Sequence, residues 1–317
     1  MNMNQSVVIS LALAAILSAG ANILRAESSN TTTAISAPLL LIENRPAVSM
    51  DIPAPPPTAR TPFLLKLILN PTAGIRDRLE AIRELDDNLD PGQIDALYSF
   101  LKSHPDSRET NPSGLRTLKN NVLNALRNQI PPPAGLTATL IDIFHDHAQD
   151  FVTRDYAVQH LTSWYSRSTG DSPDAKERIQ TTLKEAVREN TSISGTALLG
   201  MHRLSSADGS FNRREIDRSA LGMAISSDTP LAARITAIQI CAERGLGQAL
   251  PEIERYAGTR GQTALQISAI AALGKLGGAE DALLLEKLES EGDIALRPAI
   301  AAALKRLPRT LASRETY

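Results

Sequence analysis

The sequence predicts an all-α protein, an α-solenoid of about seven antiparallel helix pairs that follows a signal peptide and a disordered linker. Aromatic residues make up only 3% of a chain that is 42% hydrophobic, so the core must be built from Leu, Ile and Ala, which pack well between helices. The stretch from Ala249 to Gly278 reads as two helices joined by a tight turn. Its pattern of small and apolar residues recurs along the sequence at intervals of 31 to 43 residues, which is typical of stacked repeats.

Residues 1–26 have the composition of a signal peptide. The apolar run Val7 to Ala19 is short for a bilayer span, and the small residues from Ala19 to Ala21 match a cleavage site, with a second candidate after Ala26. No Lys or Arg precedes the run, so an uncleaved N-terminal anchor or a cytosolic protein is the alternative. We expect export to the periplasm or the extracellular space, with no stable transmembrane span after cleavage.

The remainder of the protein divides by composition. Residues 27–62 are rich in Ser, Thr, Pro and Ala and are predicted to form a disordered linker, because they cannot bury enough apolar surface to offset the entropy of ordering. Helical periodicity follows, as degenerate repeats over 63–228 and as more regular repeats over 229–308. A tail occupies 309–317.

One register relates the repeats. Each repeat contains one small or apolar residue from which the other positions are counted. These reference positions are Ala81, Val122, Ala157, Gly200, Ala237, Ala269 and Ile300. Residues one and four places later are apolar in every repeat, and these offsets share one side of a helix, so they predict its buried face. Three places earlier most residues are basic. We expect acidic residues of the preceding turn, such as Asp228 and Glu291, to cap the helix and pair with them.

The last third of the sequence has further repeat features. Arg234 and Arg297 stand three places before their reference positions, and Ala272 to Gly277 spells A-L-G-K-L-G. On these residues the protein resembles a HEAT-repeat protein, and its C-terminal third is similar to short bacterial HEAT repeats of the PBS-lyase type. The resemblance implies a curved superhelix and a protein-binding role, and it does not imply catalysis.

Charge and cysteine content exclude some classes of partner and of site. A formal net charge of −2 leaves no basic field to neutralise phosphates, so nucleic acid is not expected as a partner. The single cysteine, Cys241, excludes an internal disulfide framework, and its place in an apolar column predicts a buried thiol. The sequence contains no phosphate-binding glycine motif and no nucleophile elbow. No cofactor is predicted.

The densest polar cluster lies between residues 142 and 160. It contains Asp142, His145, Asp146, His147, Asp150 and His160. Two His on one helix converge on a metal when they are four residues apart, whereas His145 and His147 lie about 200° apart around a helix. We therefore expect an acidic, solvated helix face that ends at a turn and predict no metal ligand or catalytic residue here. A metal-assisted hydrolase, or a lyase, that uses this region is the alternative.

The polar side chains two places after the reference positions predict a binding wall. Second helices line the concave side of a solenoid, and this offset faces solvent. The candidate binding residues are Arg83, Asn124, Gln159, His202 and Gln239, together with the aromatic pair Trp164 and Tyr165 as interface anchors. Any helix needs a polar solvent face, and the two aromatic residues would equally fill a gap between repeats, so both simpler interpretations stay open.

These observations predict an exported, non-catalytic HEAT-repeat scaffold that binds an unidentified protein or peptide partner on its concave face. A cell-envelope structural protein that self-associates through exposed terminal repeats is a further alternative, because Leu307 and Leu311 are expected to lack cover.

Overall fold

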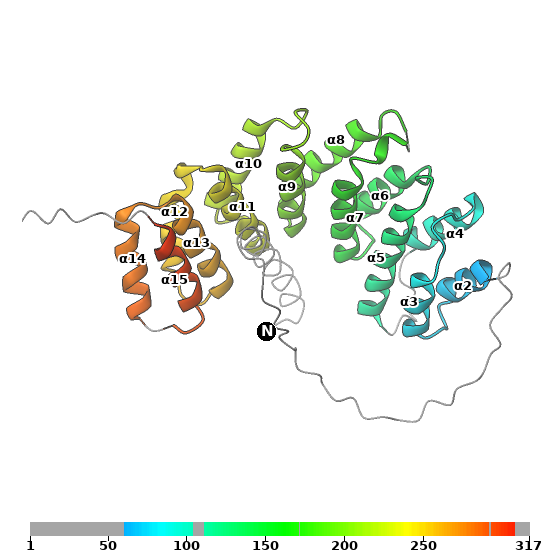
Figure 1. Ribbon diagram of the computed structural model, residues 1–317, viewed down its shortest axis with the longest axis horizontal. Coiled ribbons are helices and arrows are strands. Elements are labelled where there is room, and N and C mark those ends of the chain that lie inside the picture. Colours follow the sequence, from blue (N-terminus) through cyan, green and yellow to red (C-terminus); the bar gives the residue numbers. More distant parts are fainter. Residues whose placement is uncertain (1–59, 104–110, 171, 292, 308–317) are drawn as a thin grey trace, which may run out of the picture. The chain divides into compact units, whose positions relative to one another are not determined.

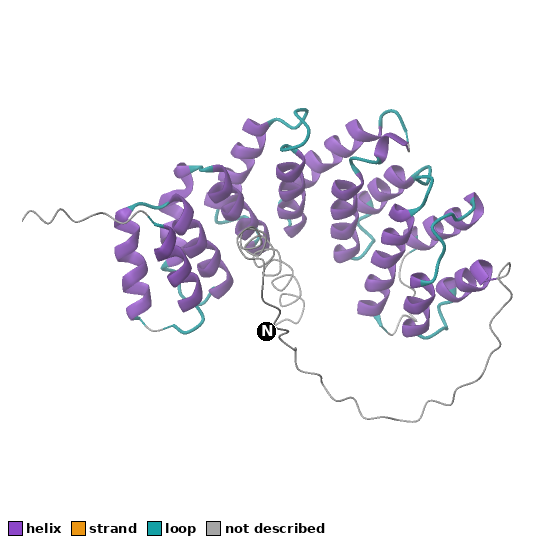
Figure 2. Ribbon diagram, viewed as in Figure 1, coloured by secondary structure: helices purple, strands orange, loops and turns teal. Residues whose placement is uncertain are grey.

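The computed structural model describes residues 60–103, 111–170, 172–291 and 293–307, and these contain 14 α-helices and no strand (Figures 1 and 2). The protein divides into two units, residues 1–63 and 64–317, and the described helices belong to the second, apart from the first residues of α2. The predicted signal peptide (1–26), the linker up to residue 59 and the tail (309–317) lie outside the described residues. Within the described ranges, no helix combines the length and the apolarity needed to cross a membrane.

The 14 helices form seven consecutive pairs, as the sequence predicted. The first helices of the pairs are α2 (Arg60–Leu69), α4 (Pro91–Lys102), α6 (Leu136–His145), α8 (Ala175–Arg188), α10 (Arg213–Ile225), α12 (Leu250–Ala257) and α14 (Ala279–Ser290). The second helices are α3 (Ile75–Arg83), α5 (Pro112–Asn128), α7 (Phe151–Trp164), α9 (Ser192–Leu204), α11 (Leu231–Arg244), α13 (Thr263–Leu276) and α15 (Arg297–Arg306). Two short 3₁₀ turns, η2 (Ser168–Gly170) and η3 (Gly247–Ala249), lie between pairs.

The pairs stack side by side into an α-solenoid. Each second helix packs against the second helix of the following pair, in sequence order from α3 to α15 (Figure 1). The first helices make a separate layer, in which α4 packs against α6, α6 against α8, and α10 against α12. The apolar side chains of both layers meet in one continuous core, which is how repeats bury faces that no single pair could bury alone.

Burial confirms the predicted register at most positions; of the residues four places after the reference positions, Leu85, Leu204 and Leu304 are only half-buried. All seven reference positions lie on second helices and are buried. The residues one place later are buried in the first six pairs, from Ile82 to Ile270, but Ala301 in α15 is exposed. No further pair stacks on α15 within the described residues, which explains the exception. The expectation that Leu307 lacks cover is wrong, since this side chain is buried, while Leu311 lies outside the described residues.

Glycine is required at two places, the end of α11 and the interior of α13. Gly245 ends α11 in the left-handed conformation, with φ of 68°, which a residue with a side chain adopts only under strain. The glycines at the end of α13 do not adopt a positive φ, since Gly277 and Gly278 have φ of −74° and −109°. Gly274 lies inside α13 instead. A Cβ there would approach the Cα of Ala303 in α15 to 2.7 Å, so this glycine permits close packing of neighbouring helices.

The basic column three places before the reference positions has a different role from the one predicted. Arg78 donates from Nε to the carbonyl of Ile68 over 2.8 Å, and Arg234 donates from Nη2 to the carbonyl of Thr229 over 2.8 Å. Lys119 donates from Nζ to the carbonyl of Leu101 over 2.9 Å. The carbonyls of Ile68 and Leu101 lie in the last turn of the first helix of the same pair, whereas that of Thr229 lies in the turn before α11. In these pairs the column binds carbonyls that lack intrahelical partners, at a helix C-terminus or in the turn between the two helices.

The acidic residues predicted to pair with this column have other partners. Glu291 forms an ion pair with Arg260 over 3.0 Å and so joins the turn of the sixth pair to the seventh pair. Asp228 accepts from the Ser227 hydroxyl over 3.4 Å and does not cap α11, whose N-cap residue is Pro230. Ion pairs between consecutive pairs do exist, for example Arg116 with Asp150 over 2.8 Å, and one of them uses the basic column, because Arg154 pairs with Glu189 of the following pair over 2.7 Å.

Candidate functional site

The residues predicted to form a binding wall lie on the solvent side of the second helices. Four of them come from consecutive helices of this layer and are half-buried; we call them the wall residues: Asn124 in α5, Gln159 in α7, His202 in α9 and Gln239 in α11. Arg83 in α3 occupies the same offset and is exposed. Consecutive second helices are in contact, so the wall residues form a row that runs across the helices.

The first two wall residues are each held by one hydrogen bond within their own helix. Asn124 accepts from Arg127 Nη2 over 3.2 Å through Oδ1, which leaves the Asn124 amide NH₂ group available to donate. Gln159 donates from Nε2 to Asp155 Oδ2 over 2.8 Å, which leaves its Oε1 available to accept. Each side chain is held by one hydrogen bond and keeps further hydrogen-bonding capacity.

The other two wall residues contain buried nitrogen atoms with no hydrogen-bond partner among the described residues. His202 Nε2 lies 3.0 Å from Glu243 Oε2, and this hydrogen bond lowers the pKa of Glu243, while His202 Nδ1 has no partner. Gln239 Nε2 has none either. A buried polar group without a partner costs about 1–3 kcal/mol.

Asp155 lies directly beside the row, one helical turn before Gln159. Burial raises the pKa of Asp155, and the nearby Thr196 hydroxyl and Gln159 amide only partly oppose this shift. Its Oδ1 atom is buried and lacks a hydrogen-bond partner among the described residues. Since Thr196 belongs to α9, the carboxyl group sits at the junction of α7 and α9 and is biased toward its neutral form.

His160 occupies the corresponding junction between α5 and α7. Its Nε2 lies 2.9 Å from Asn120 Oδ1, and its Nδ1 is buried without a partner in the described part of the protein. Burial, and secondarily the positive charge of Arg127, lower the pKa of His160 to about 4. The imidazole is therefore neutral at physiological pH.

The aromatic pair predicted to anchor an interface is not exposed. Trp164 is 0% exposed and Tyr165 is 3% exposed. The indole Nε1 of Trp164 donates to Thr137 Oγ1 over 3.1 Å, and the Tyr165 hydroxyl donates to Asp208 Oδ2 over 2.7 Å. Both aromatic residues therefore fill gaps between helices, which is the simpler interpretation given above. Their polar ends are hydrogen-bonded to other side chains of the protein.

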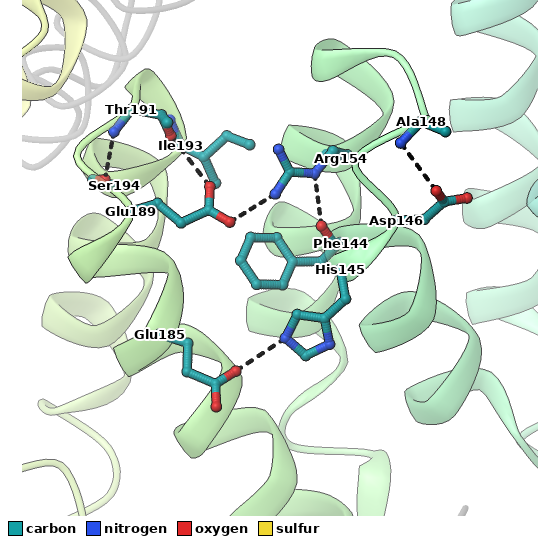
Figure 3. Close-up of polar contacts among 10 residues, drawn as sticks. All are labelled: Phe144, His145, Asp146, Ala148, Arg154, Glu185, Glu189, Thr191, Ile193 and Ser194. Atoms are coloured by element: carbon teal, nitrogen blue, oxygen red, sulfur yellow. Dashed lines mark hydrogen bonds and ion pairs between the residues drawn. The ribbon is translucent and has the colours of Figure 1, made fainter.

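The polar cluster between residues 142 and 160 does not converge on one point. Helix α6 ends at His145 and α7 begins at Phe151, so the acidic helix face ends at a turn, as expected, and Asp146 and Asp150 lie in that turn. His145 Nε2 lies 3.0 Å from Glu185 of α8, and the Asp146 side chain accepts from the amide of Ala148 over 3.0 Å (Figure 3). In Figure 3 the two side chains point away from one another.

The other members of this cluster have separate partners. Asp142 pairs with Lys102 over 2.7 Å, and Asp150 caps α7 by accepting from the amide of Val152 over 2.9 Å. His147 is exposed in the turn between α6 and α7. No group of three or more His, Cys, Asp or Glu side chains suited to a metal ion occurs among the described residues.

Two cavities lie next to these helices, and both are small. One of about 30 Å³ is lined by the N-terminal parts of α5 and α7 and by Arg116, Lys119 and Asp150. The other, between Trp164 and His160, leaves no room for a water molecule. Sites for drug-sized ligands typically occupy about 300–1,000 Å³, so neither cavity has the size of a usual cofactor site.

Cys241 is buried as predicted. Burial, and secondarily the negative charge of Asp217, raise the pKa of its thiol to about 12. A thiol with so high a pKa holds almost no thiolate at neutral pH, and the thiolate is the reactive form. Cys241 therefore serves as a small apolar core residue.

Sequence reasoning missed three residues that border the row: Asn120, Asp155 and Thr196. Asp155 could have been found, because it precedes Gln159 by four residues and so shares its helix face. Asn120 and Thr196 could not have been found, since each contributes only through a contact with a neighbouring helix. Such contacts depend on how far neighbouring helices are shifted along their axes.

Comparisons with known proteins identify no family for the protein. No protein-family model matches it, and no curated protein matches it. Among solved structures it is similar to human deoxyhypusine hydroxylase in complex with glycerol, with a TM-score of 0.31 and 12% identity over 78% of this protein and 95% of the hydroxylase. It is also similar to an engineered protein, with a TM-score of 0.33 and 16% identity over 78% and 98%. Similarities this distant carry no argument about function.

Proposed function

We propose that this protein is an exported, non-catalytic scaffold of the HEAT type that binds a protein or peptide partner on the solvent face of its second helices. The observation that carries the proposal is the row of wall residues, in which four consecutive repeats present an uncharged hydrogen-bonding side chain at the same offset. A surface needed only for solubility favours charged residues, which stay better hydrated than half-buried amides.

The hydrogen-bonding state of the row supports the proposal. Asn124 and Gln159 are oriented by Arg127 and Asp155, as expected of groups that are held ready for a ligand. Gln239 contains a buried nitrogen atom without a partner among the described residues. A partner that hydrogen-bonds to these groups gains affinity because little ordering remains to be done on the scaffold side.

The binding proposal is tested by affinity purification with matched variants. The full-length protein, the double variant Gln159→Ala/Gln239→Ala and the control Gln248→Ala, which changes an exposed glutamine outside the row, are tagged and purified from the periplasmic fraction. Quantitative mass spectrometry then compares the proteins that co-purify. We expect at least one partner to fall about tenfold in yield with the double variant only. Equal recovery with all three proteins would show that the row is not the binding surface.

The export proposal rests on residues 1–26 and is tested separately. Cell fractionation should place the protein in the periplasm or the medium, and N-terminal sequencing should show that the mature protein starts directly after Ala21 or Ala26. An intact N-terminus in the membrane fraction would favour the uncleaved anchor. An intact N-terminus in the cytosol would contradict export.

A further inference from the structure

We propose that the partner is an extended peptide segment that the wall residues recognise through its backbone, with little contribution from charged side chains. This inference rests on the proposed binding function of the same surface. It concerns which chemical groups of the partner are recognised. Three features of the row argue for it: its hydrogen-bonding chemistry, its low charge and its spacing.

The chemistry of the row matches that of a peptide group. An amide side chain offers one acceptor oxygen and two N–H donors, so it can bond to a backbone N–H and a backbone carbonyl at the same time. Asn124 has a free donor side and Gln159 has a free acceptor side. The Gln239 amide, whose Nε2 lacks a partner within the described residues, satisfies that nitrogen by turning toward a peptide carbonyl.

The row is also nearly uncharged. The wall residues contain no Lys, Arg, Asp or Glu, and the adjacent Asp155 is biased toward its neutral form. Two charged groups border the row, the Arg127 guanidinium that donates to Asn124 and the Glu243 carboxylate that is hydrogen-bonded to His202. An acidic or basic peptide would therefore meet opposing charge at single points and not along the whole row. Hydrogen bonds to the backbone remain as the main source of affinity.

The spacing of the row suits an extended peptide. Neighbouring packed helices lie about 8–10 Å apart, and an extended peptide advances about 3.3 Å per residue, so one helix corresponds to about three peptide residues. The row spans α5, α7, α9 and α11, which are neighbours in that order. A peptide of about ten residues lying across these helices would therefore meet each wall residue once.

The residues on either side of the row indicate where the backbone hydrogen bonds to a bound peptide would begin and end. Arg83 in α3 lies before the row at the same offset, whereas Ala271 in α13 and Ala302 in α15 follow it. Hydrogen-bonding side chains are thus replaced by small apolar ones beyond α11. We expect a bound peptide to lose backbone hydrogen bonds past this helix.

The test uses a displayed library of random peptides of about twelve residues, long enough to cross the four helices, selected against the full-length protein. A selected peptide is synthesised, and its affinity is measured for the wild type, for Gln159→Ala/Gln239→Ala and for the control Gln248→Ala. Each backbone amide of the peptide is then replaced by an ester, which removes one N–H donor and leaves the side chain unchanged. A parallel set replaces each side chain by that of alanine.

We expect at least one ester position, opposite the free acceptor oxygen of Gln159, to weaken binding about 3- to 10-fold, whereas Asn124 and Gln239 donate to peptide carbonyls that an ester retains. Charged side chains should contribute less than about twofold, and raising NaCl from about 50 to about 500 mM should change the affinity less than about threefold. If the double variant weakens binding but no ester does, the row binds peptides through their side chains, and only this inference fails. If no peptide is selected, or if the double variant binds as the wild type does, the proposed function of the row fails as well.

Discussion

The guanidinium group of Arg154 in α7 donates from Nε to the backbone carbonyl of Phe144 in the last turn of α6, over 2.7 Å. The same side chain pairs through Nη2 with Glu189 at the end of α8, also over 2.7 Å (Figure 3). One buried cation thus satisfies a helix C-terminus in its own pair and contacts the following pair. Arg78 and Lys119 satisfy the first of these roles in their own pairs, and Arg234 binds a carbonyl of the turn between the two helices of its pair.

Replacing Arg154 should destabilise the third and fourth pairs together. In Arg154→Met the carbonyl of Phe144 and the carboxylate of Glu189 both lose their donor, and we expect a loss of about 2–4 kcal/mol. Hydrogen exchange should accelerate at the ends of α6 and α8. The matched control is Arg203→Met, which changes an exposed arginine on α9 and should have little effect. Equal thermal stability of the two variants would contradict this role for Arg154.

Gly195 in α9 allows the close approach of α11. A Cβ added there would lie 2.7 Å from the Cα of Ala233, so Gly195→Ala must push the two helices apart and should cost about 1–3 kcal/mol. Gly222 in α10 has no atom within 4 Å of the same added Cβ. Because Ala favours helix, Gly222→Ala should stabilise the protein by about 0.5–1 kcal/mol. Chemical denaturation followed by circular dichroism measures both, and a shift of the same sign in the two variants would refute the packing argument.

The neutral state of His160 predicts a loss of stability in acid. The folded protein binds a proton at His160 only near pH 4, whereas the unfolded protein binds it near the ordinary histidine pKa of 6.5. Between these values the unfolded state holds more protons, so stability falls as pH falls, by about 3 kcal/mol in total. His160→Gln should remove this part of the decline, since a glutamine does not titrate.

The measurement for His160 is the melting temperature from neutral pH down to about pH 4, the folded-state pKa. We expect the wild type to lose stability relative to His160→Gln across this range. His147→Gln replaces an exposed histidine and serves as the control, with a profile parallel to that of the wild type. A constant difference between wild type and His160→Gln at every pH would contradict the burial of a neutral imidazole.

The raised pKa of Asp155 predicts the opposite dependence. The folded state retains this proton at higher pH than the unfolded state, so the penalty for the buried charge appears as pH rises and is relieved as pH falls toward 3.8. Asp155→Asn should therefore be more stable than the wild type at neutral pH, by about 2–4 °C in Tm for each kcal/mol regained. Asp87→Asn, at an exposed position, should leave Tm unchanged. A lower Tm for Asp155→Asn at neutral pH would show that the carboxylate is needed in its charged form.

The sequence by itself determined the helix pairs, their number and the buried face of each second helix. The apolar positions from Ala81 to Ile300 are set by the helical period of about 3.6 residues and by its recurrence, and both are visible in one dimension. Tertiary structure decided which atoms meet between helices. In the folded protein Arg154 donates to a backbone carbonyl and Asp155 lies beside Thr196. Trp164 is buried, and Ala301 is exposed. Those outcomes depend on the axial shift between packed helices and on where stacking stops, and no periodicity within one helix encodes either.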